Sequence, residues 1–300
     1  MMKVLIAGCG DLGLRVAALL CAAGHEVIGI RRSPANAHPA FFPASSDSRP
    51  ADSSRGAPAS TRFRWLQADL IDPASLSSLP TDITHAIFAA SPDLRQESAY
   101  RKLFIKGLQN LVAALNPSAL ERFMLVSSSA VYGEHKDQWI DEQTATDPLG
   151  FNGRVLVEAE QWLLSQPFET VILRPSGIYG PGRDQLLTRI RQGLAAVPRD
   201  APHWSNRIHI EDAARAVIHL MALPDPENMY LVTDGHPYAM HVLYERLAQM
   251  LGAPVPPEGP APSMIGSKKL SNARLISTGF EMVWPDALIG YAKLIDQASG

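Results

Sequence analysis

Short apolar runs alternate with amphipathic stretches along the first part of the chain. The apolar runs have the length of buried strands, and the stretches between most of them repeat apolar residues at helical spacing. The runs are 4–7, 26–30, 63–67, 85–90, 122–127 and 170–173, and the helical stretches are 12–23, 73–79, 94–115 and 153–164. This alternation predicts an α/β fold of the Rossmann type, a doubly wound parallel sheet with helices on both faces.

The regular alternation covers residues 1–175 and then becomes irregular. We expect 176–300 to form a smaller C-terminal lobe that lacks a large core of its own, so its segment 205–223 is predicted to pack back on the first domain. Residues 34–60 interrupt the pattern, because 18 of these 27 positions are Pro, Ala or Ser. Such a composition cannot bury enough apolar surface, and it predicts a disordered insertion.

A glycine-rich segment, GCGDLG at 8–13, follows the first predicted strand and opens the first predicted helix. Strand, glycine turn and helix in this order make a dinucleotide-binding site. Gly8 permits the tight turn, Gly10 lets the backbone approach a pyrophosphate, and Gly13 lets the helix pack close to the strand. The N–H groups at the helix N-terminus, beginning with Asp11 and Leu12, then hold the phosphate charge. Residues 1–175 are therefore predicted to bind a dinucleotide, and a plain glycine turn is the alternative.

The second predicted strand continues into Arg31 and Arg32. NAD-selective sites usually carry Asp or Glu here for the ribose hydroxyls, whereas guanidinium groups match a 2′-phosphate. NADP is therefore the preferred cofactor and NAD the alternative, unless the arginines are only a solvated charge pair. Asp69, followed by Leu70, is a further candidate as an acceptor for the adenine amino group, with a plain turn aspartate as the alternative. The small residues Ala89, Ala90 and Ser91 are candidates beside the ribose.

Charge and cysteine content narrow the class of protein. A formal net charge of −3 offers no basic footprint for nucleic acid. No apolar run approaches ~20 residues, so we expect no membrane partner. Cys9 and Cys21 are the only cysteines and lack metal-ligand spacing, which predicts a cytoplasmic protein without a metal site or disulfide. The expected partner is a small-molecule substrate.

The fifth predicted strand ends in the segment SSSAVYG at 127–133, whose hydroxyl groups can donate to a substrate carbonyl. The alternative is that these strand-end serines only bond the backbone of the loop. This segment joins three others: ADL at 68–70, LRPSGIYGPGR at 173–183 and NRIHIEDAARA at 206–216. Together with the glycine segment, they resemble the extended short-chain dehydrogenase/reductases, the NAD-dependent epimerase/dehydratase family, over nearly the whole length. The spacing GxGxxG is similar to that of the atypical YeeZ-like branch.

The resemblance implies roles for single residues. Ser128, with Ser129 beside it, matches the hydroxyl that holds the substrate oxygen. Tyr179 matches a residue lining the substrate site, and Arg207 matches an arginine that binds diphosphate in relatives acting on sugar nucleotides, with a surface salt bridge as the alternative. The resemblance also implies that residues 176–300 form the substrate lobe and that a homodimer is possible.

The family's general acid, a Tyr four residues before a Lys, has no counterpart in the matching region 147–160. Tyr132 and Lys136 do have that spacing, but Gly133 argues against a helix that would stack them. We nevertheless rank Tyr132 first as the replacement acid, because the motif places it close to the site. Loss of a positioned general acid lowers the rate about 10²–10⁴-fold, so three hypotheses stay open. The first is an NADP(H)-dependent enzyme, which is an oxidoreductase, an epimerase or a dehydratase. The second is a catalytically weak NADP(H) sensor, and the third is a protein that uses the cofactor structurally while binding a partner protein.

Overall fold

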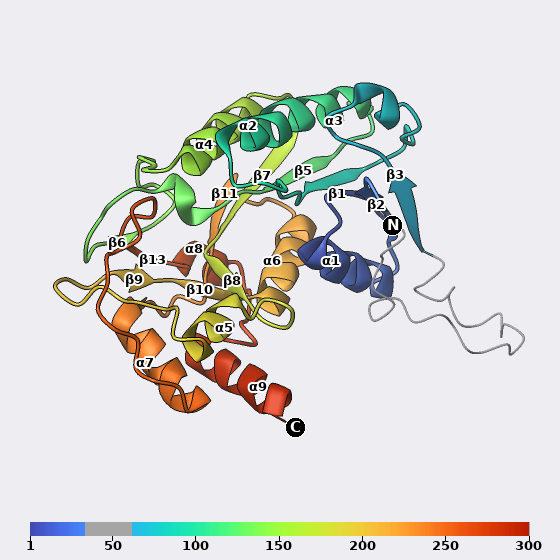
Figure 1. Cartoon of the computed structure of the whole chain (residues 1–300). Helices are drawn as coiled ribbons and strands as arrows, with labels where there is room; N and C mark the ends of the chain where they lie inside the picture. Colours follow the sequence, from blue (N-terminus) through green and yellow to red (C-terminus); the bar gives the residue numbers. More distant parts are fainter. Residues whose placement is uncertain (34–61, 300) are drawn as a thin grey trace, which may run out of the picture. The chain divides into compact units, whose positions relative to one another are not determined.

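The computed structural model of the chain describes residues 1–33 and 62–299, so the predicted insertion over 34–60 lies outside the described residues. Seven strands form one sheet in the order β11-β7-β5-β4-β1-β2-β3 (Figure 1). These strands are β1 (Lys3–Ala7), β2 (Glu26–Arg31), β3 (Phe63–Gln67), β4 (His85–Phe88), β5 (Arg122–Val126), β7 (Glu169–Pro175) and β11 (Met229–Val232). The pairs β1–β2, β1–β4, β2–β3 and β4–β5 are parallel, and the predicted Rossmann-type α/β fold is confirmed.

The helices lie between the strands largely as the sequence predicts. They are α1 (Asp11–Ala22), α2 (Glu97–Tyr100), α3 (Leu108–Ala114), α4 (Phe151–Leu164), α5 (Gln185–Arg191), α6 (Ile210–Ala222), α7 (Met240–Leu251), α8 (Ala273–Ser277) and α9 (Ala287–Ser299). None of the helices in the described ranges is long and apolar enough to cross a membrane. Short two- and three-residue strands complete the fold: β6 (Trp139–Ile140), β8 (Gly177–Tyr179), β9 (Trp204–Ser205), β10 (Arg207–His209), β12 (Tyr238–Ala239) and β13 (Lys269–Leu270).

The chain divides into two compact units that interleave along the sequence. The first unit is Met1–Val126, Glu158–Ile172 and Val217–Asn228, and the second unit is Ser127–Val157, Leu173–Ala216 and Met229–Gly300. In the first unit, α1 and the α2–α3 segment cover opposite faces of the strands (Figure 1). Central strands enclosed in this way are apolar on both faces, and all four residues of β4 are buried.

Two predicted helices of the first unit differ in detail from the sequence pattern. The stretch 73–79 forms only a one-turn 3₁₀ helix, Pro73–Leu76, which begins where the Asp72 carboxylate accepts a hydrogen bond from the backbone N–H of Ala74 at 3.1 Å. The stretch 94–115 is interrupted by a π-helical segment, Arg101–Gly107, between α2 and α3.

The second unit surrounds its own apolar cluster and uses side chains to close its backbone. The cluster includes Tyr179, Leu243, Leu247 and Tyr291. At the outer edge of β11, side chains bind backbone groups that no further described strand of the sheet pairs: Glu142 Oε1 accepts from Leu231 N at 2.7 Å, Arg274 Nη1 donates to Met229 O at 3.0 Å, and Asn272 Nδ2 donates to Thr233 O at 3.1 Å. Capping of this kind protects an edge strand from pairing with another chain.

Candidate functional site

The glycine turn of the first unit joins β1 to α1. Gly8 has φ +81°, and a Cβ atom at Gly8 would lie 2.2 Å from the Cα of Ala90, so only glycine fits this position. At Gly13 a Cβ would meet the side chain of Ile6 at 3.1 Å, which explains the close packing of helix on strand. At Gly10, among the described residues other than its two chain neighbours, the nearest atom to an added Cβ is the Gly8 carbonyl oxygen at 3.9 Å. The backbone at Gly10 is therefore approachable, as a bound pyrophosphate requires.

The first turn of α1 lies directly behind this approachable backbone. Gly10 is the N-cap residue and makes no side-chain cap, and Asp11 and Leu12 are the first two helical residues. Their N–H groups precede the hydrogen-bonded part of the helix, and such groups bind anions. The Asp11 carboxylate accepts from Arg15 Nε at 3.1 Å, which partly offsets a negative charge close to the helix N-terminus. The turn therefore fits the phosphate groups of a dinucleotide.

Arg31 and Arg32 lie at the carboxyl end of β2 in different surroundings. The Arg31 guanidinium is 5.8 Å from the centre of the Trp65 ring, a cation–π arrangement. Arg32 Nη2 donates to both carboxylate oxygens of Asp93, at 2.6 and 2.7 Å, and this bond raises the pKa of Arg32. Both side chains of that pair are more than half exposed, so the pair is weakly held and Arg32 can turn to another anion.

The loops after β3 and β4 hold the other predicted cofactor residues. Asp69 Oδ1 accepts from Ile71 N at 3.0 Å, an Asx-type turn, and Leu70 is buried. The sequence reasoning missed Asn110, a buried residue whose amide donates to the Leu70 carbonyl at 2.9 Å and fixes this loop. After β4, Ala90 is buried against Gly8, Ala89 is half-buried, and Ser91 is exposed, so small residues border the glycine turn.

Both cysteines of the chain are buried free thiols in the first unit. Burial raises the pKa of Cys9 to about 12 and that of Cys21 to about 11. The thiols therefore stay protonated and act as small apolar groups rather than nucleophiles. Within residues 1–33 and 62–299, no cluster of three or more His, Cys, Asp or Glu side chains is arranged to hold a metal ion.

In the second unit, a 3₁₀ turn over Ser129–Val131 follows β5 and carries the serine cluster. Ser128 is its N-cap: Ser128 Oγ accepts from Ala130 N at 3.1 Å. This bond fixes the oxygen, while the hydroxyl hydrogen stays available to donate. Ser127 is buried, whereas Ser128 and Ser129 are half-buried. The Ser128 hydroxyl therefore keeps its hydrogen for an acceptor other than the turn's own N–H group.

Tyr132 ends this turn and is 1% exposed. Its hydroxyl accepts from Arg174 Nη1 at 2.7 Å and donates to the Asp141 carbonyl at 3.1 Å, and the Arg174 guanidinium lies 4.9 Å from the ring centre. The role of Tyr132 as a proton donor stays a prediction, and both its burial and its two hydrogen bonds count against that role. No signal in the sequence pairs Tyr132 with Arg174, because 42 residues separate them.

The segment that lacks the Tyr–Lys pair packs against the serine turn. A Cβ at Gly153, in the first turn of α4, would lie 2.2 Å from the Ala130 carbonyl oxygen, so this helix begins in direct contact with the turn. Asn152 stands beside it with a buried Oδ1 that has no hydrogen-bond partner among the described residues. Lys136 has φ +53° and lies outside any helix, so Tyr132 and Lys136 do not form a helical pair.

A second lysine, Lys268, lies against the same turn and was not singled out from the sequence. It is 3% exposed, and its Nζ donates to the carbonyl oxygens of Tyr132 at 3.2 Å and Gly266 at 3.0 Å. Burial lowers the pKa of Lys268 to about 8. These bonds tie the end of the serine turn to the loop before β13.

The two predicted substrate residues lie on neighbouring short strands of the second unit. Tyr179 is 1% exposed, stacks on Tyr291 with ring centres 4.3 Å apart, and has its hydroxyl against Gly290, where an added Cβ would be 2.1 Å away. This packing assigns Tyr179 to the core and counts against a contact with substrate. Arg207 is half-buried on β10, which pairs with β8.

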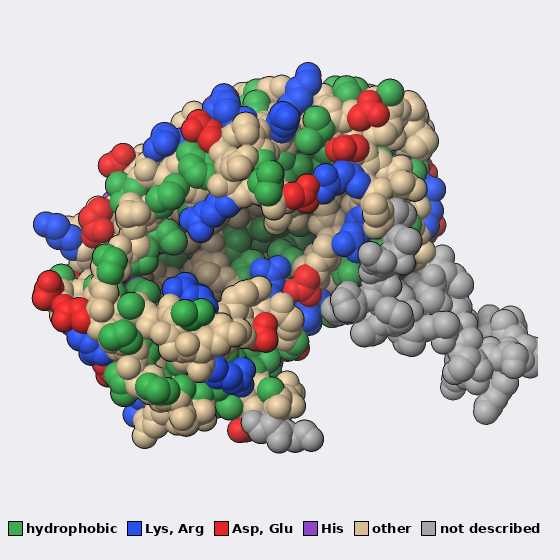
Figure 2. Space-filling view, viewed as in Figure 1, with side chains coloured by type: hydrophobic (Ala, Val, Ile, Leu, Met, Phe, Trp, Pro, Cys, Tyr) green, Lys and Arg blue, Asp and Glu red, His purple; other side chains and the backbone are tan. Residues whose placement is uncertain are grey.

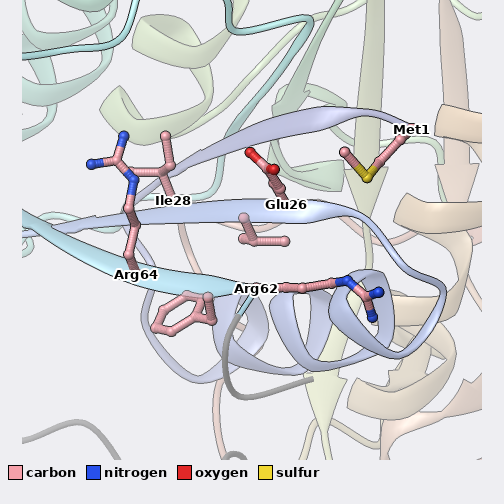
Figure 3. A pocket seen from close by; sticks show the side chains of 7 residues that line it. Met1, Glu26, Ile28, Arg62 and Arg64 are labelled. Carbon is pink, nitrogen blue, oxygen red and sulfur yellow. The ribbon is translucent and has the colours of Figure 1, made fainter. Parts of the chain in front are cut away.

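A pocket in the first unit lies away from the predicted cofactor residues. Figure 3 shows its lining side chains, which come from the N-terminus and from the starts of β2 and β3: Met1, Glu26, Val27, Ile28, Arg62, Phe63 and Arg64. Ligands of open parallel sheets bind at the carboxyl ends of the strands, which is the opposite edge. On the face shown in Figure 2, basic and acidic side chains alternate without a continuous basic surface.

Comparison with known proteins agrees with this geometry. The family model described as the NAD dependent epimerase/dehydratase family matches residues 4–232. Protein YeeZ of Escherichia coli (strain K12) is 28% identical over 293 residues, which cover 96% of this chain and 98% of YeeZ. A solved structure from Methylobacillus flagellatus, assigned to the NAD-dependent epimerases/dehydratases, is 34% identical with a TM-score of 0.76, and the match covers 100% of this chain and 99% of that one.

The UDP-glucose 4-epimerase of Thermus thermophilus, solved in complex with NAD, shares the fold at 21% identity, with a TM-score of 0.76 over 100% of this chain and 99% of that chain. The match to the family model spans both the glycine turn and the serine turn. The chain belongs to the NAD dependent epimerase/dehydratase family, the extended short-chain dehydrogenase/reductases.

Proposed function

We propose that this protein binds NADP(H) at the glycine turn of its first unit. The observation that carries the proposal is the contrast between two glycines of this turn. Gly8 packs so closely against Ala90 that no side chain fits, while Gly10 leaves the backbone before α1 accessible to a ligand. The N–H groups of Asp11 and Leu12 would hold the pyrophosphate. Arg31 and Arg32 would hold the 2′-phosphate, since guanidinium groups bind phosphate more tightly than ribose hydroxyls. Asp69, Leu70, Ala89, Ala90 and Ser91 would border the adenosine and ribose.

We further propose that the protein is an oxidoreductase, epimerase or dehydratase acting on a small molecule with a carbonyl group or an oxidisable hydroxyl group. The bound cofactor supplies hydride transfer. Ser128 donates its hydroxyl hydrogen to the substrate oxygen, and the bond from Ala130 N to Ser128 Oγ sets that direction before substrate arrives. Ser129 and Arg207 are secondary contacts. The residue that moves the substrate proton is left unassigned, because Tyr132 is buried between Arg174 and Asp141.

Calorimetric titration with NADPH and NADH tests the cofactor assignment. Replacing both Arg31 and Arg32 by Ala is expected to weaken NADPH binding at least about tenfold more than NADH binding, because each charge-assisted bond contributes about 1.5–3 kcal/mol. Arg64→Ala is the control, since Arg64 lies near the start of β3 while Arg31 pairs with Gln67 at its end. Equal weakening of both cofactors in the double variant would defeat the NADP assignment.

A second candidate function is an NADP(H) sensor with little turnover. The missing Tyr–Lys pair and the engaged hydroxyl of Tyr132 favour this function. Purified protein with NADPH and a panel of carbonyl and sugar-nucleotide substrates discriminates the two. Consumption of NADPH that falls at least about 10²-fold in Ser128→Ala supports the enzyme, and tight binding without consumption across the panel supports the sensor.

A further inference from the structure

Four buried polar atoms that lack hydrogen-bond partners among the described residues belong to neighbouring residues of the second unit: Ser176 Oγ, Tyr179 OH, Arg207 Nε and Asp234 Oδ2. Backbone contacts bring their residues together. Arg207 is in register with Gly177, which follows Ser176, and the Arg207 carbonyl accepts from Asp234 N at 2.8 Å. Because nearly all buried polar atoms in proteins are paired, a group of such atoms at one place indicates a missing polar partner.

The cluster lies at the carboxyl ends of β7 and β11, where ligands of parallel sheets bind. Ser176 directly follows β7, and Asp234 comes two residues after β11. Each is 6% exposed. The hydroxyl of Tyr179 is held against Gly290, so Ser176, Arg207 and Asp234 are the groups that a ligand would meet.

The unpaired atoms differ in hydrogen-bonding character. Arg207 Nε can only donate, and an ionised Asp234 Oδ2 can only accept, while Ser176 can do either. Asp234 Oδ1 already accepts from His236 N at 3.0 Å, and the backbone N–H of Ala287 also interacts with this carboxylate. Leaving a donor and an acceptor unpaired is costly, about 1–3 kcal/mol for each. A hydroxyl group satisfies both kinds of atom, because its oxygen accepts while its hydrogen donates.

Charge distinguishes a hydroxyl from a phosphate at this place. One guanidinium, Arg207, stands near two carboxylates, Asp234 and Asp286, and Tyr238 donates to Asp286 at 2.8 Å. Burial, helped by the charge of Asp286, raises the pKa of Asp234 to about 7, while the N–H groups of His236 and Ala287 and the charge of Arg207 oppose the rise. A diphosphate would bring further negative charge beside these carboxylates, and unpaired buried charges of like sign are strongly unfavourable.

We propose that Ser176, Arg207 and Asp234 form a subsite for an uncharged hydroxyl-bearing part of the substrate, and that Asp234 excludes a diphosphate from Arg207. The substrate class is therefore a neutral hydroxylated carbonyl compound or polyol rather than a nucleotide sugar. This subsite rests on the proposed function for its substrate, but it belongs to the second unit alone. Asp234 is the specificity-determining residue.

The test compares wild type with Asp234→Asn, and uses Asp296→Asn as the matched control, because Asp296 is exposed on α9 and makes the same charge change. UDP binding is measured by calorimetry at about pH 8.5, above the Asp234 pKa of about 7, so that this carboxylate is ionised. The protein is saturated with NADP⁺, after a separate NADP⁺ titration. Asp234→Asn is expected to strengthen UDP binding at least about tenfold, which corresponds to about 1.4 kcal/mol. Asp296→Asn is expected to leave it unchanged. Tight UDP binding by wild type, or no gain in Asp234→Asn, overturns the exclusion of diphosphate.

Ligand-observed NMR with a panel of neutral sugars and polyols tests whether the subsite binds an uncharged hydroxyl-bearing group. We expect binding by wild type that is lost in Ser176→Ala and in Asp234→Asn, with unfolding temperatures confirming that both variants fold. A panel without any binder, or binding that both variants retain, overturns the hydroxyl subsite. Failure of the separate NADP⁺ titration would instead contradict the proposed function, and UDP titrations without NADP⁺ then still decide the role of Asp234.

Discussion

The first unit is organised mainly by backbone ladders, with a few buried side chains such as Asn110 bonded to a distant backbone group. The second unit relies more on bonds of the latter kind. In the first unit, β1 pairs residue by residue with β2 and β4, and a helix covers each face. In the second unit, the fully buried Asp212 carboxylate accepts from Val283 N at 3.0 Å and Trp284 N at 2.7 Å. A backbone ladder distributes its contribution to stability over many equivalent hydrogen bonds. A clasp, by which we mean one buried side chain that binds distant backbone groups as Asp212 does, depends on that single side chain.

This difference predicts different sensitivities. In the first unit we expect large effects where the backbone itself is crowded, above all at glycine. In the second unit we expect large effects where one polar side chain is removed, because its partners are then left buried and unpaired. Substitutions at both kinds of position test the contrast.

Gly8→Ala is expected to have the largest effect. The added methyl group would lie 2.2 Å from the backbone of Ala90, at a residue with φ +81°. Backbone strain of about 1–3 kcal/mol and overpacking of a similar size together predict a loss of about 4 kcal/mol in unfolding free energy, with loss of NADPH binding. Urea unfolding measures the first and calorimetry the second.

Gly24→Ala controls for the backbone term alone, because Gly24 has φ +92° but no described atom within 4 Å of an added Cβ. It is expected to cost about 1–2 kcal/mol and to keep cofactor binding. Equal costs for the two variants would show that the contact with Ala90 does not matter.

Asp212→Ala should follow, with a loss of about 3 kcal/mol. The substitution leaves the N–H groups of Val283 and Trp284 without their acceptor and removes the partner of Arg215. Asp212→Asn retains one acceptor oxygen and is expected to cost about half as much. Urea unfolding of both variants measures the difference, and a cost below that of an ordinary surface substitution for Asp212→Ala would refute the clasp.

The pH dependence of stability provides a third comparison. The pKa of Asp234 is about 7 in the folded protein and 3.8 when unperturbed, so the folded state favours the protonated form. The contribution of Asp234 to the unfolding free energy is fully present below the unfolded-state pKa and is lost as the pH rises toward about 7. Between about pH 5 and pH 8 we expect wild type to lose about 2–3 kcal/mol more unfolding free energy than Asp234→Asn. Parallel pH profiles for the two proteins would contradict this assignment.

Asp93→Ala should have the smallest effect and the opposite sign. The Asp93 carboxylate binds Arg32 and competes with a 2′-phosphate for it. Removing an exposed competitor of this kind is expected to strengthen NADPH binding by about 0.5 kcal/mol and to leave NADH unchanged. By calorimetry, the affinity for NADPH should rise in Asp93→Ala and fall in Arg32→Ala. Affinity changes in the same direction in both variants would place Arg32 outside the cofactor site.

The difference between the two units also explains which features could be predicted from the sequence. The central strands of the first unit are apolar runs covered on both faces, and their positions follow from the sequence to within about two residues. The edge strand β3 was also predicted, although its side chains are half-buried or exposed. The glycine turn is equally local, since strand, turn and helix are contiguous in the chain. The pattern did not predict β11, α5, α8 or α9.

The contacts of the second unit depend on pairs far apart in sequence. Arg174 reaches Tyr132 across 42 residues, and Lys268 reaches the Tyr132 carbonyl across 136. No periodicity or short motif encodes such pairs, which is why Tyr132 could be ranked as an acid from its motif although the structure buries its hydroxyl. Asp234 lacked a sequence signal for the same reason, because its surroundings come from β10 and the start of α9.

Hydrogen–deuterium exchange of the wild-type protein with and without saturating NADPH tests the central claim most directly. Slower exchange is expected at residues 8–15, where the backbone N–H groups of the glycine turn and the first turn of α1 would bind phosphate. Slower exchange is also expected at 89–93, next to Gly8. Unchanged exchange in both segments of a folded protein, together with no heat of binding, would contradict the assignment of a dinucleotide site to this turn.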